Sequence, residues 1–217
     1  MNTSLKLFSY FRSSCAYRVR IALNIKNIPY DIIPIHLLKE GGEQYTLEYR
    51  QLNPSAQVPT LVDKGVPMGQ SLAILEYIEE KYPSIPLLPS SPIDRALVRQ
   101  MNEIINSGMQ PLQNLSVTQY LYHQLTISDE QKTQWLTTWM HRGFESLENL
   151  FQKHSGLFCF GDHVTLADCC LIPQVFSAQR FGVDLSPFSK TMTIYKKATE
   201  LSAFIQASPE RQPDYQP

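Results

Sequence analysis

Two serine hydroxyls and a cysteine thiol stand side by side where a strand is expected to end and a helix to begin. Residues 5–10 form a short, largely apolar run typical of a strand, and apolar residues recur at helical spacing from Val19 onward. Ser13, Ser14 and Cys15 therefore fall at the N-terminus of the expected helix. Unpaired backbone N–H groups and the positive end of the helix dipole favour an anion at such a place. Serine is also a preferred helix cap, so a purely structural role stays open.

Residues 1–82 alternate expected strand, helix and strand, as in a thioredoxin-like α/β domain. A second strand is expected at 30–35. A third opens with Val58-Pro59, because a proline is tolerated at the first position of a strand. The polar, glycine-bearing stretch 39–44 is expected to be a solvated loop, and its residue types alone assign it no chemistry.

A second helix N-terminus is expected at Gln70-Ser71, where Ser71 is placed to cap the following helix. The next stretch, 83–92, holds four prolines and three serines and cannot form a regular element. We therefore divide the chain into a thioredoxin-like domain at 1–82, a linker at 83–91 and an all-helical domain at 92–217.

Three capping boxes mark expected helix starts in the helical domain. They lie at 91–94, 128–131 and 165–168. Asp168 closes the third box and is accordingly assigned a structural role. The last residues, 208–217, contain three prolines and are expected to form a loosely held tail.

Composition limits the classes of function. The chain has 217 residues, enough to bury a core without disulfides or metals, and 19 basic against 20 acidic residues give a net charge of −1. This balance gives no support to a nucleic-acid partner and favours a small-molecule ligand. No apolar run approaches the ~20 residues that span a membrane, and the first residues lack a basic and apolar leader. We therefore expect a cytoplasmic protein without a membrane partner.

The spacing of cysteines and histidines argues against metal and disulfide chemistry. The four cysteines follow no zinc or disulfide pattern, and reduced thiols fit a cytosolic compartment. None of the five histidines has a partner at metal-ligand spacing, so we assign no metal. Arg18 stands where a thioredoxin-type Cys-x-x-Cys would have its second cysteine.

The segment 13–23, Ser-Ser-Cys-x-x-Arg-Val-Arg-Ile-Ala-Leu, resembles the signature of the zeta-class glutathione transferases, the family of maleylacetoacetate isomerase. Further matches along nearly the whole chain are Val58-Pro59, Gln70-Ser71, the block 110–116, the segment 173–175 and Arg180. The resemblance implies an α/β plus all-α protein, with an N-terminal thioredoxin-like domain and an all-helical C-terminal domain. It also implies glutathione as the cofactor and a homodimer.

The resemblance implies the site residues as well. Catalytic roles fall to Ser13, Ser14 and Cys15. The implied cofactor-binding residues are Ser13, Ser14, Cys15, Gln44, Val58, Gln70, Ser71, Gln110, Asn114 and Ser116. In thioredoxin-like families the proline after a residue placed like Val58 is cis, and the backbone before it meets the cysteine-containing ligand. Arg12 and Arg180 are expected to hold substrate carboxylates, which guanidinium groups bind bidentately.

The implied function is glutathione-dependent cis–trans isomerisation of maleylacetoacetate to fumarylacetoacetate in tyrosine and phenylalanine breakdown, by reversible addition of the glutathione thiolate. Other functions stay open at this point. The same site would serve general conjugation or the dehalogenation of α-haloacids. A glutathione-dependent thiol oxidoreductase would use Cys15 covalently, and a fold member without catalysis would be a binding module. The block 110–116 also has a structural reading, as a polar turn after a kinked helix.

Overall fold

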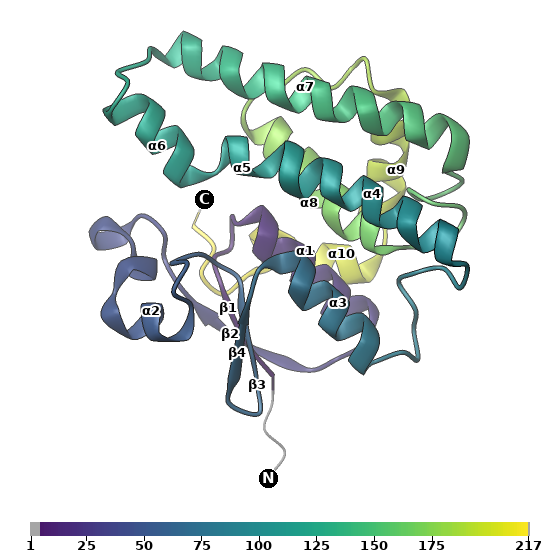
Figure 1. Ribbon diagram of the computed structural model, residues 1–217, viewed down its shortest axis with the longest axis horizontal. Helices are drawn as coiled ribbons and strands as arrows, with labels where there is room; N and C mark the ends of the chain where they lie inside the picture. Colours follow the sequence, from purple (N-terminus) through teal and green to yellow (C-terminus); the bar gives the residue numbers. More distant parts are fainter. Residues whose placement is uncertain (1–4, 217) are drawn as a thin grey trace. The chain divides into compact units, whose positions relative to one another are not determined.

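The computed structural model describes residues 5–216 of the chain, which form two compact units. The first unit holds the described residues up to Leu87 together with those from Glu200 onward, and the second holds Leu88–Thr199. A mixed sheet with helices makes up the first unit, and the second is built of helices (Figure 1). The expected combination of a thioredoxin-like α/β part and an all-helical part is confirmed.

The sheet of the first unit has four strands in the order β2-β1-β3-β4. They are β1 (Leu5–Ser9), β2 (Tyr30–Pro34), β3 (Thr60–Asp63) and β4 (Val66–Gly69). β1 and β2 are parallel, with Leu7 opposite Ile32, because helix α1 (Ser14–Ile25) carries the chain back along the sheet. β3 runs antiparallel to β1 and β4, and a tight turn at Lys64 and Gly65, both with positive φ, joins β3 to β4.

Helices α1 and α3 (Ser71–Lys81) pack together and bury their apolar faces with the sheet. Leu7 and Leu61 of the sheet, Val19 of α1 and Ile78 of α3 lie in one fully buried cluster. Burial of a side chain of this size stabilises a fold by about 1.5–3 kcal/mol. The cluster therefore holds both helices, and with them their N-terminal ends, in fixed positions on the sheet.

The stretch between β2 and β3 is more ordered than the expected solvated loop. It contains the short 3-10 helices η1 (Lys39–Gly41) and η2 (Glu43–Tyr45) and the helix α2 (Leu47–Leu52). Glu43 Oε2 accepts a hydrogen bond from the His36 N–H at 2.6 Å, and His36 Nδ1 accepts from the Lys39 N–H at 2.9 Å. Side-chain acceptors thus satisfy the backbone donors that a simple loop would leave to water.

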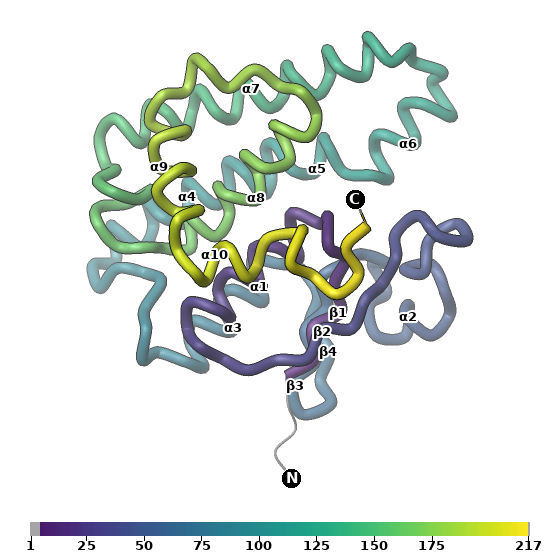
Figure 2. Tube along the Cα trace, turned by 180° about the vertical axis from the view of Figure 1, so that it is seen from behind, coloured from purple at the N-terminus to yellow at the C-terminus, as the bar shows by residue number. Residues whose placement is uncertain are grey.

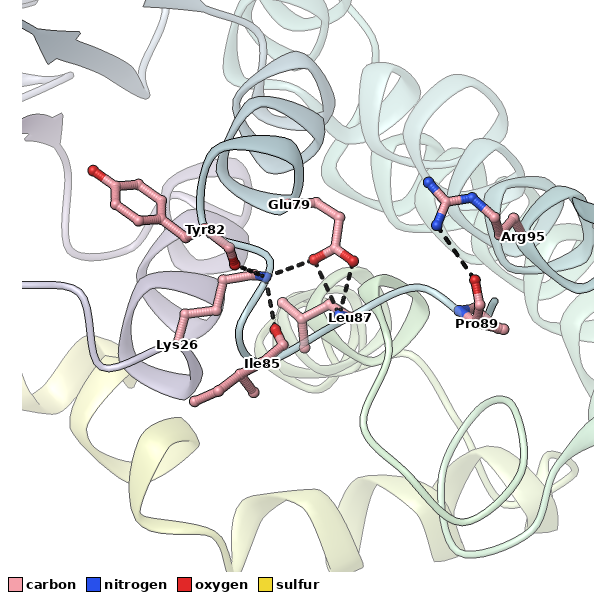
Figure 3. Close-up of polar contacts among 7 residues, drawn as sticks. All are labelled: Lys26, Glu79, Tyr82, Ile85, Leu87, Pro89 and Arg95. Atoms are coloured by element: carbon pink, nitrogen blue, oxygen red, sulfur yellow. Dashed lines mark hydrogen bonds and ion pairs between the residues drawn. The ribbon is translucent and has the colours of Figure 1, made fainter. Parts of the chain in front are cut away.

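A buried ion pair anchors the chain where it leaves α3. Lys26 Nζ lies 2.6 Å from Glu79 Oε2, and the two side chains are 1% and 7% exposed. Lys26 also donates to the carbonyls of Tyr82 (2.9 Å) and Ile85 (2.7 Å), and the Leu87 N–H donates to both Glu79 oxygens, at 3.1 and 3.0 Å (Figure 3). The start of the proline-rich segment is therefore held by the C-cap residue of α1 and by a side chain of α3.

The second unit consists of helices α4 to α9. They are α4 (Pro92–Gly108), α5 (Gln110–Gln113), α6 (Leu115–His123), α7 (Asp129–His154), α8 (Leu166–Arg180) and α9 (Ser189–Thr199). Both α4 and α9 pack against α7 and α8. In the described part of the chain, no helix combines the length and the apolar character that crossing a membrane requires.

Two of the three expected capping boxes are present. Ser128 with Gln131 caps α7, and Thr165 with Asp168 caps α8. Asp168 is fully buried and also accepts a hydrogen bond from the Cys159 N–H at 2.9 Å. Burial raises the pKa of Asp168, while the hydrogen bonds from Cys159 and Thr165 act in the opposite direction. Asp168 is structural, as predicted.

Two predicted caps are absent. Ser91 precedes α4, with Pro92 at the first helical position, but its side chain makes no capping hydrogen bond. Ser71 is the first residue of α3 and does not cap it, because Gln70 occupies the N-cap position. Ser71 Oγ instead accepts a hydrogen bond from Arg18 Nη1 at 3.1 Å. The local pattern could not show this, because the competing donor lies on another helix.

The prediction of a loosely held C-terminal tail was wrong for the residues that the structure describes. The chain continues through α10 (Ser202–Ala207) and η3 (Pro209–Arg211), and α10 packs against α1 (Figure 2). Within the predicted tail, Pro209 and Gln212 are buried, and the Gln212 side chain donates to the carbonyls of Gln206 (3.1 Å) and Ser208 (2.8 Å). The described residues from Glu200 onward therefore belong to the first unit, although the predicted helical domain included them. Pro209 is tolerated at the first position of η3, and the prolines of this segment do not prevent its packing.

We expect Lys26→Met to lower the free energy of unfolding by about 3–5 kcal/mol, because it removes the ammonium group that compensates a buried carboxylate. Urea denaturation measures the loss. The double variant Lys26→Met/Glu79→Gln should recover part of it, since the second substitution removes the buried charge and keeps an acceptor for Leu87. Lys6→Met, at an exposed position of β1, is the control and should change stability by less than about 0.5 kcal/mol. Equal losses of stability in Lys26→Met and Lys6→Met would contradict the stabilising role assigned to the Lys26–Glu79 ion pair.

Candidate functional site

Ser13 is the N-cap of α1. Its Oγ accepts a hydrogen bond from the Ala16 N–H (3.2 Å), and its own N–H donates to the Tyr10 carbonyl (3.0 Å), which closes a turn over residues 10–13. The first bond fixes Ser13 Oγ and leaves its single hydroxyl proton for a second partner. Ser14 and Cys15 occupy the first two helical positions, whose backbone N–H groups have no acceptor within a helix. The expected helix start is confirmed.

A positive charge lies just before this helix. Residues 12–15 are each half-buried. The Arg12 guanidinium lies 5.8 Å from the centroid of the Tyr10 ring and 5.5 Å from that of Phe11, and Arg12 Nη2 donates to the Tyr10 hydroxyl at 3.3 Å. Such cation–π contacts contribute about 0.5–1 kcal/mol at exposed sites. Two aromatic rings thus define where the Arg12 charge sits.

The Val58-Pro59 peptide bond is cis, as the resemblance implied. Val58 is buried in a cluster with Tyr10, Phe11 and Tyr49. The structure therefore brings Val58 against the turn that leads into the helix with the two serines and the cysteine.

Gln70 and Ser71 stand at the N-terminus of α3. Gln70 is exposed and has a φ of +64°, a conformation that residues other than glycine rarely adopt and that is concentrated at functional sites. Ser71 is buried, and its bond to Arg18 ties the start of α3 to α1. The two predicted helix N-termini are therefore joined through one guanidinium.

Gln44 is buried in η2. Its Nε2 donates to the Leu37 carbonyl at 3.3 Å, whereas Oε1 is buried without a hydrogen bond to any described residue. Gly42 packs against this amide, since a Cβ there would come within 2.5 Å of Gln44 Nε2. A buried acceptor without a partner requires an explanation, and a bound ligand with an N–H group is one.

Gln110, Asn114 and Ser116 lie in the second unit, around the breaks that separate α4, α5 and α6. Gln110 is half-buried and begins α5. Asn114 is the N-cap of α6, and its Oδ1 accepts from the N–H (3.1 Å) and the hydroxyl (3.0 Å) of Ser116. Local capping accounts for these contacts. The block 110–116 forms α5 and the start of α6, and is not the polar turn of the structural alternative.

Arg180 ends α8 in the same unit. Its side chain is exposed, and its guanidinium lies 4.1 Å from the centroid of the Phe181 ring. Further back on α8, the buried Gln174 amide exchanges two hydrogen bonds of 3.0 Å with Gln113 of α5. This reciprocal pair joins the short helix that begins at Gln110 to the helix that ends at Arg180.

Two fully buried arginines of α1 were not predicted as functional residues. Arg18 binds Ser71, and Arg20 donates to the carbonyls of Phe11 (3.0 Å) and Ala207 (2.9 Å). Burial lowers the pKa of Arg20 to about 10, a value at which it still carries its charge at neutral pH. The sequence held a signal for both, because Arg-Val-Arg interrupts an otherwise apolar helical run.

Among residues 5–216, no cluster of three or more His, Cys, Asp or Glu side chains is arranged to hold a metal. The four cysteines in that range are free thiols, and three of them are buried. Burial raises the pKa of the Cys159 thiol, which disfavours its reactive form. Cys15 is half-buried and is the cysteine placed at a helix N-terminus.

Comparison with known families assigns both parts of the chain. Residues 12–81 match the family described as "Glutathione S-transferase, N-terminal domain", and residues 129–207 match "Glutathione S-transferase, C-terminal domain". The maleylacetoacetate isomerase of Mus musculus is 49% identical over 208 residues, which cover 96% of this chain and 94% of that protein.

Solved structures agree with this assignment. A maleylpyruvate isomerase, described as a bacterial glutathione S-transferase of the zeta class, matches with a TM-score of 0.93 and 38% identity over 97% of this chain and 100% of that chain. The maleylacetoacetate isomerase of Anaeromyxobacter dehalogenans, with glutathione bound in its active site, matches with a TM-score of 0.88 and 38% identity over 98% of each chain. The chain therefore belongs to the zeta class of the glutathione S-transferases, the family of the maleylacetoacetate isomerases.

Proposed function

We propose that this protein catalyses the glutathione-dependent cis–trans isomerisation of maleylacetoacetate to fumarylacetoacetate, a step of tyrosine and phenylalanine breakdown. The observation that carries the proposal is the Ser13 hydroxyl, held at the N-terminus of α1 by Ala16 and preceded by Arg12. Family membership supports this reaction, because the mouse relative is named a maleylacetoacetate isomerase.

Groups of the first unit fit glutathione. The N-termini of α1 and α3 favour anions, and glutathione offers a thiolate and carboxylates. The buried Gln44 Oε1 offers an acceptor to a peptide N–H. We assign Ser13, Ser14 and Cys15 to the thiol, Gln44 and Val58 to the peptide backbone, and Gln70 and Ser71 to the γ-glutamyl carboxylate. Gln110, Asn114 and Ser116 of the second unit are proposed as further glutathione contacts on the family resemblance alone.

The main task of the protein is to stabilise a thiolate. A free thiol with a pKa of about 8.5 is only slightly ionised at neutral pH. A hydroxyl bonded to an anion contributes about 1.5–3 kcal/mol, and a helix N-terminus contributes about 0.3–1 kcal/mol. The hydroxyl therefore lowers the thiol pKa by about 1–2 and the helix by less than about 1. We assign the hydroxyl to Ser13, because the bond it accepts from Ala16 fixes its oxygen and polarises its O–H.

Each residue of the proposed site has one task in the reaction. When bound, glutathione supplies the thiolate that adds reversibly to the conjugated cis double bond, permits rotation while that bond is single, and leaves unchanged. Ser13 donates its hydroxyl proton in a hydrogen bond to the sulfur. Arg12 and Arg180 bind the two carboxylates of the substrate and orient it for the addition. Cys15 assists orientation and is not the nucleophile.

A cytoplasmic location, a homodimer and a division of labour between the units complete the proposal. Free thiols at the cysteines of the described chain suit a reducing compartment. The homodimer follows from the family resemblance. The sheet-containing unit is the glutathione-binding domain in this proposal, and the helical unit supplies Arg180.

The direct test is the isomerisation of maleylacetoacetate by the purified protein with and without glutathione. Turnover should require glutathione, and the glutathione concentration should be unchanged at the end. Consumption of glutathione would indicate conjugation instead. Isomerisation at the same rate without glutathione would refute the mechanism.

Replacement of Ser13 tests whether its hydroxyl stabilises the thiolate of bound glutathione. Ser13→Ala should lower kcat by roughly 10–100-fold and raise the pKa of the bound thiol by about 1–2, because it removes the hydrogen bond to the sulfur. Ser14→Ala should have a smaller effect on both. Ultraviolet absorbance of the thiolate against pH and steady-state kinetics provide the measurements.

Ser128→Ala is the matched control for Ser13→Ala. It removes the N-cap of α7 and should lower stability by the same amount, about 1 kcal/mol, without changing the thiol pKa. An unchanged thiol pKa in Ser13→Ala would remove the role assigned to Ser13.

Cys15→Ala should keep most of the isomerase activity. The expectation follows because the reacting thiol arrives with glutathione, and Cys15 has no second cysteine at the spacing of a redox pair. Steady-state kinetics and calorimetric glutathione affinity are the measurements. A fall to the background rate with native glutathione affinity would favour a covalent role for Cys15.

Arg12→Gln and Arg180→Gln should each lower kcat/KM for maleylacetoacetate, by up to roughly 100-fold, because loss of a carboxylate contact misplaces the substrate. Glutathione affinity should change little. Arg50→Gln is the control, since the Arg50 guanidinium also stacks on an aromatic ring, that of Tyr45, and has no proposed substrate contact. Native efficiency in either variant would show that its arginine does not bind a substrate carboxylate.

A further inference from the structure

The C-terminal segment, residues 200–216, contacts Phe11, which precedes Arg12. Asp214 Oδ2 accepts a hydrogen bond from the Phe11 N–H at 2.9 Å. The Tyr215 ring packs edge-on against the Phe11 ring, with centroids 5.6 Å apart and an interplanar angle of 87°. These contacts join residues more than 200 positions apart in the chain, and Figure 2 shows the yellow C-terminal segment passing the purple N-terminal region.

Arg20 binds the backbone carbonyl of Phe11, opposite the N–H that Asp214 binds. Its Nη2 donates to the Phe11 carbonyl (3.0 Å), its Nη1 donates to the Tyr10 carbonyl (3.4 Å), and its Nε donates to the Ala207 carbonyl (2.9 Å). Both backbone groups of Phe11 are therefore bonded to side chains, one from α1 and one from the C-terminal segment. Asp214 also acts on Arg20 through its charge, since it opposes the lowering of the Arg20 pKa by burial.

Phe11 is the second residue of the turn that ends at Ser13. The Ser13 N–H donates to the Tyr10 carbonyl and closes the turn, while the bond from the Ala16 N–H holds Ser13 separately at the start of α1. The Arg12 guanidinium rests on the Phe11 ring, 5.5 Å from its centroid. Phe11 is 4% exposed, so its N–H depends on the acceptor that Asp214 supplies. The position of Phe11 thus determines where the Arg12 guanidinium stands.

We propose that Asp214 is a positioning residue for the isomerase site, and that the C-terminal segment sets the place of Arg12 through Phe11. Asp214 accepts a hydrogen bond from the Phe11 N–H, Tyr215 packs edge-on against the Phe11 ring, and the Arg12 guanidinium lies over that ring. The inference rests on the proposed function, because it assigns Arg12 to a substrate carboxylate. The inference adds that the contact of Arg12 with the substrate depends on Asp214 and Tyr215 in the C-terminal segment.

Asp214→Ala removes the acceptor for Phe11, and Asp214→Asn keeps one. We expect Asp214→Ala to lower kcat/KM for maleylacetoacetate roughly tenfold, since a small displacement of a binding group carries a large loss of rate. Asp214→Asn should restore most of the activity. Hydrogen exchange at the Phe11 amide should be at least about tenfold faster in Asp214→Ala than in the native protein.

A double-variant cycle separates positioning of Arg12 from a general loss of structure. In the Arg12→Gln background, Asp214→Ala should reduce kcat/KM by less than about twofold, because the group it positions is already absent. Glu210→Ala is the matched control. Glu210 is exposed in the same segment, contributes to the charge around Arg20, and makes no hydrogen bond to the turn 10–13 within the described residues.

Tyr215→Ala provides a second variant that leaves the buried core intact, since Tyr215 is 40% exposed. It should lower kcat/KM in the same direction as Asp214→Ala, by a smaller factor, and again only when Arg12 is present. Native kcat/KM in both Asp214→Ala and Tyr215→Ala would overturn the proposal. Losses that are fully additive with Arg12→Gln would overturn it as well.

The proposed function and this inference fail in different ways. If the native protein binds glutathione and does not isomerise maleylacetoacetate, the function fails. The inference is then decided by exchange at the Phe11 amide and by binding of a dicarboxylate, malonate, measured calorimetrically in the presence of glutathione. Faster exchange and weaker malonate binding in Asp214→Ala, with native behaviour in Glu210→Ala, support it, and unchanged values overturn it.

Discussion

The structure of the first unit depends on the unpaired backbone donors at the N-terminus of α1. A helix leaves its first N–H groups without internal acceptors. Here the N–H of Ala16 is bonded by Ser13 Oγ, and the two N–H groups before it belong to Ser14 and Cys15. The place where an anion is stabilised is therefore set by where α1 begins. Three features fix the position of this helix N-terminus. They are the turn at 10–13, the cis Val58-Pro59 bond and the packing of α1 on the sheet.

Two arginines on the buried side of α1 link this helix by hydrogen bonds to other parts of the first unit. Arg18 reaches Ser71 at the start of α3, and Arg20 reaches Phe11 and Ala207. A buried guanidinium requires acceptors for its donors, because leaving them without partners is unfavourable. Arg20 thus fixes several backbone and hydroxyl groups at once, and Arg18 fixes the Ser71 hydroxyl. The helix that presents the site also holds its surroundings.

Local signals placed the helix starts correctly and were less reliable for the capping hydrogen bonds. The boxes at Ser128 and Thr165 bond residues three positions away, and both are present. Ser71 has the same local appearance, yet its hydroxyl binds Arg18 on another helix. Ser91 has a suitable neighbour and no capping bond. A capping pattern therefore predicts the helix start better than it predicts the hydrogen bond.

The sequence by itself determined the fold class, the family and the place of Ser13, Ser14 and Cys15, because these follow from periodicity and from a motif within one short segment. Tertiary structure decided the burial of Arg18 and Arg20, the unpaired acceptor of Gln44 and the packing of the chain from Glu200 onward with the first unit. Asp214 stands after a proline in a polar segment, and nothing local marks it as a partner of Phe11. Contacts across such a separation arise only when the folded chain brings both ends together, so no local pattern encodes them.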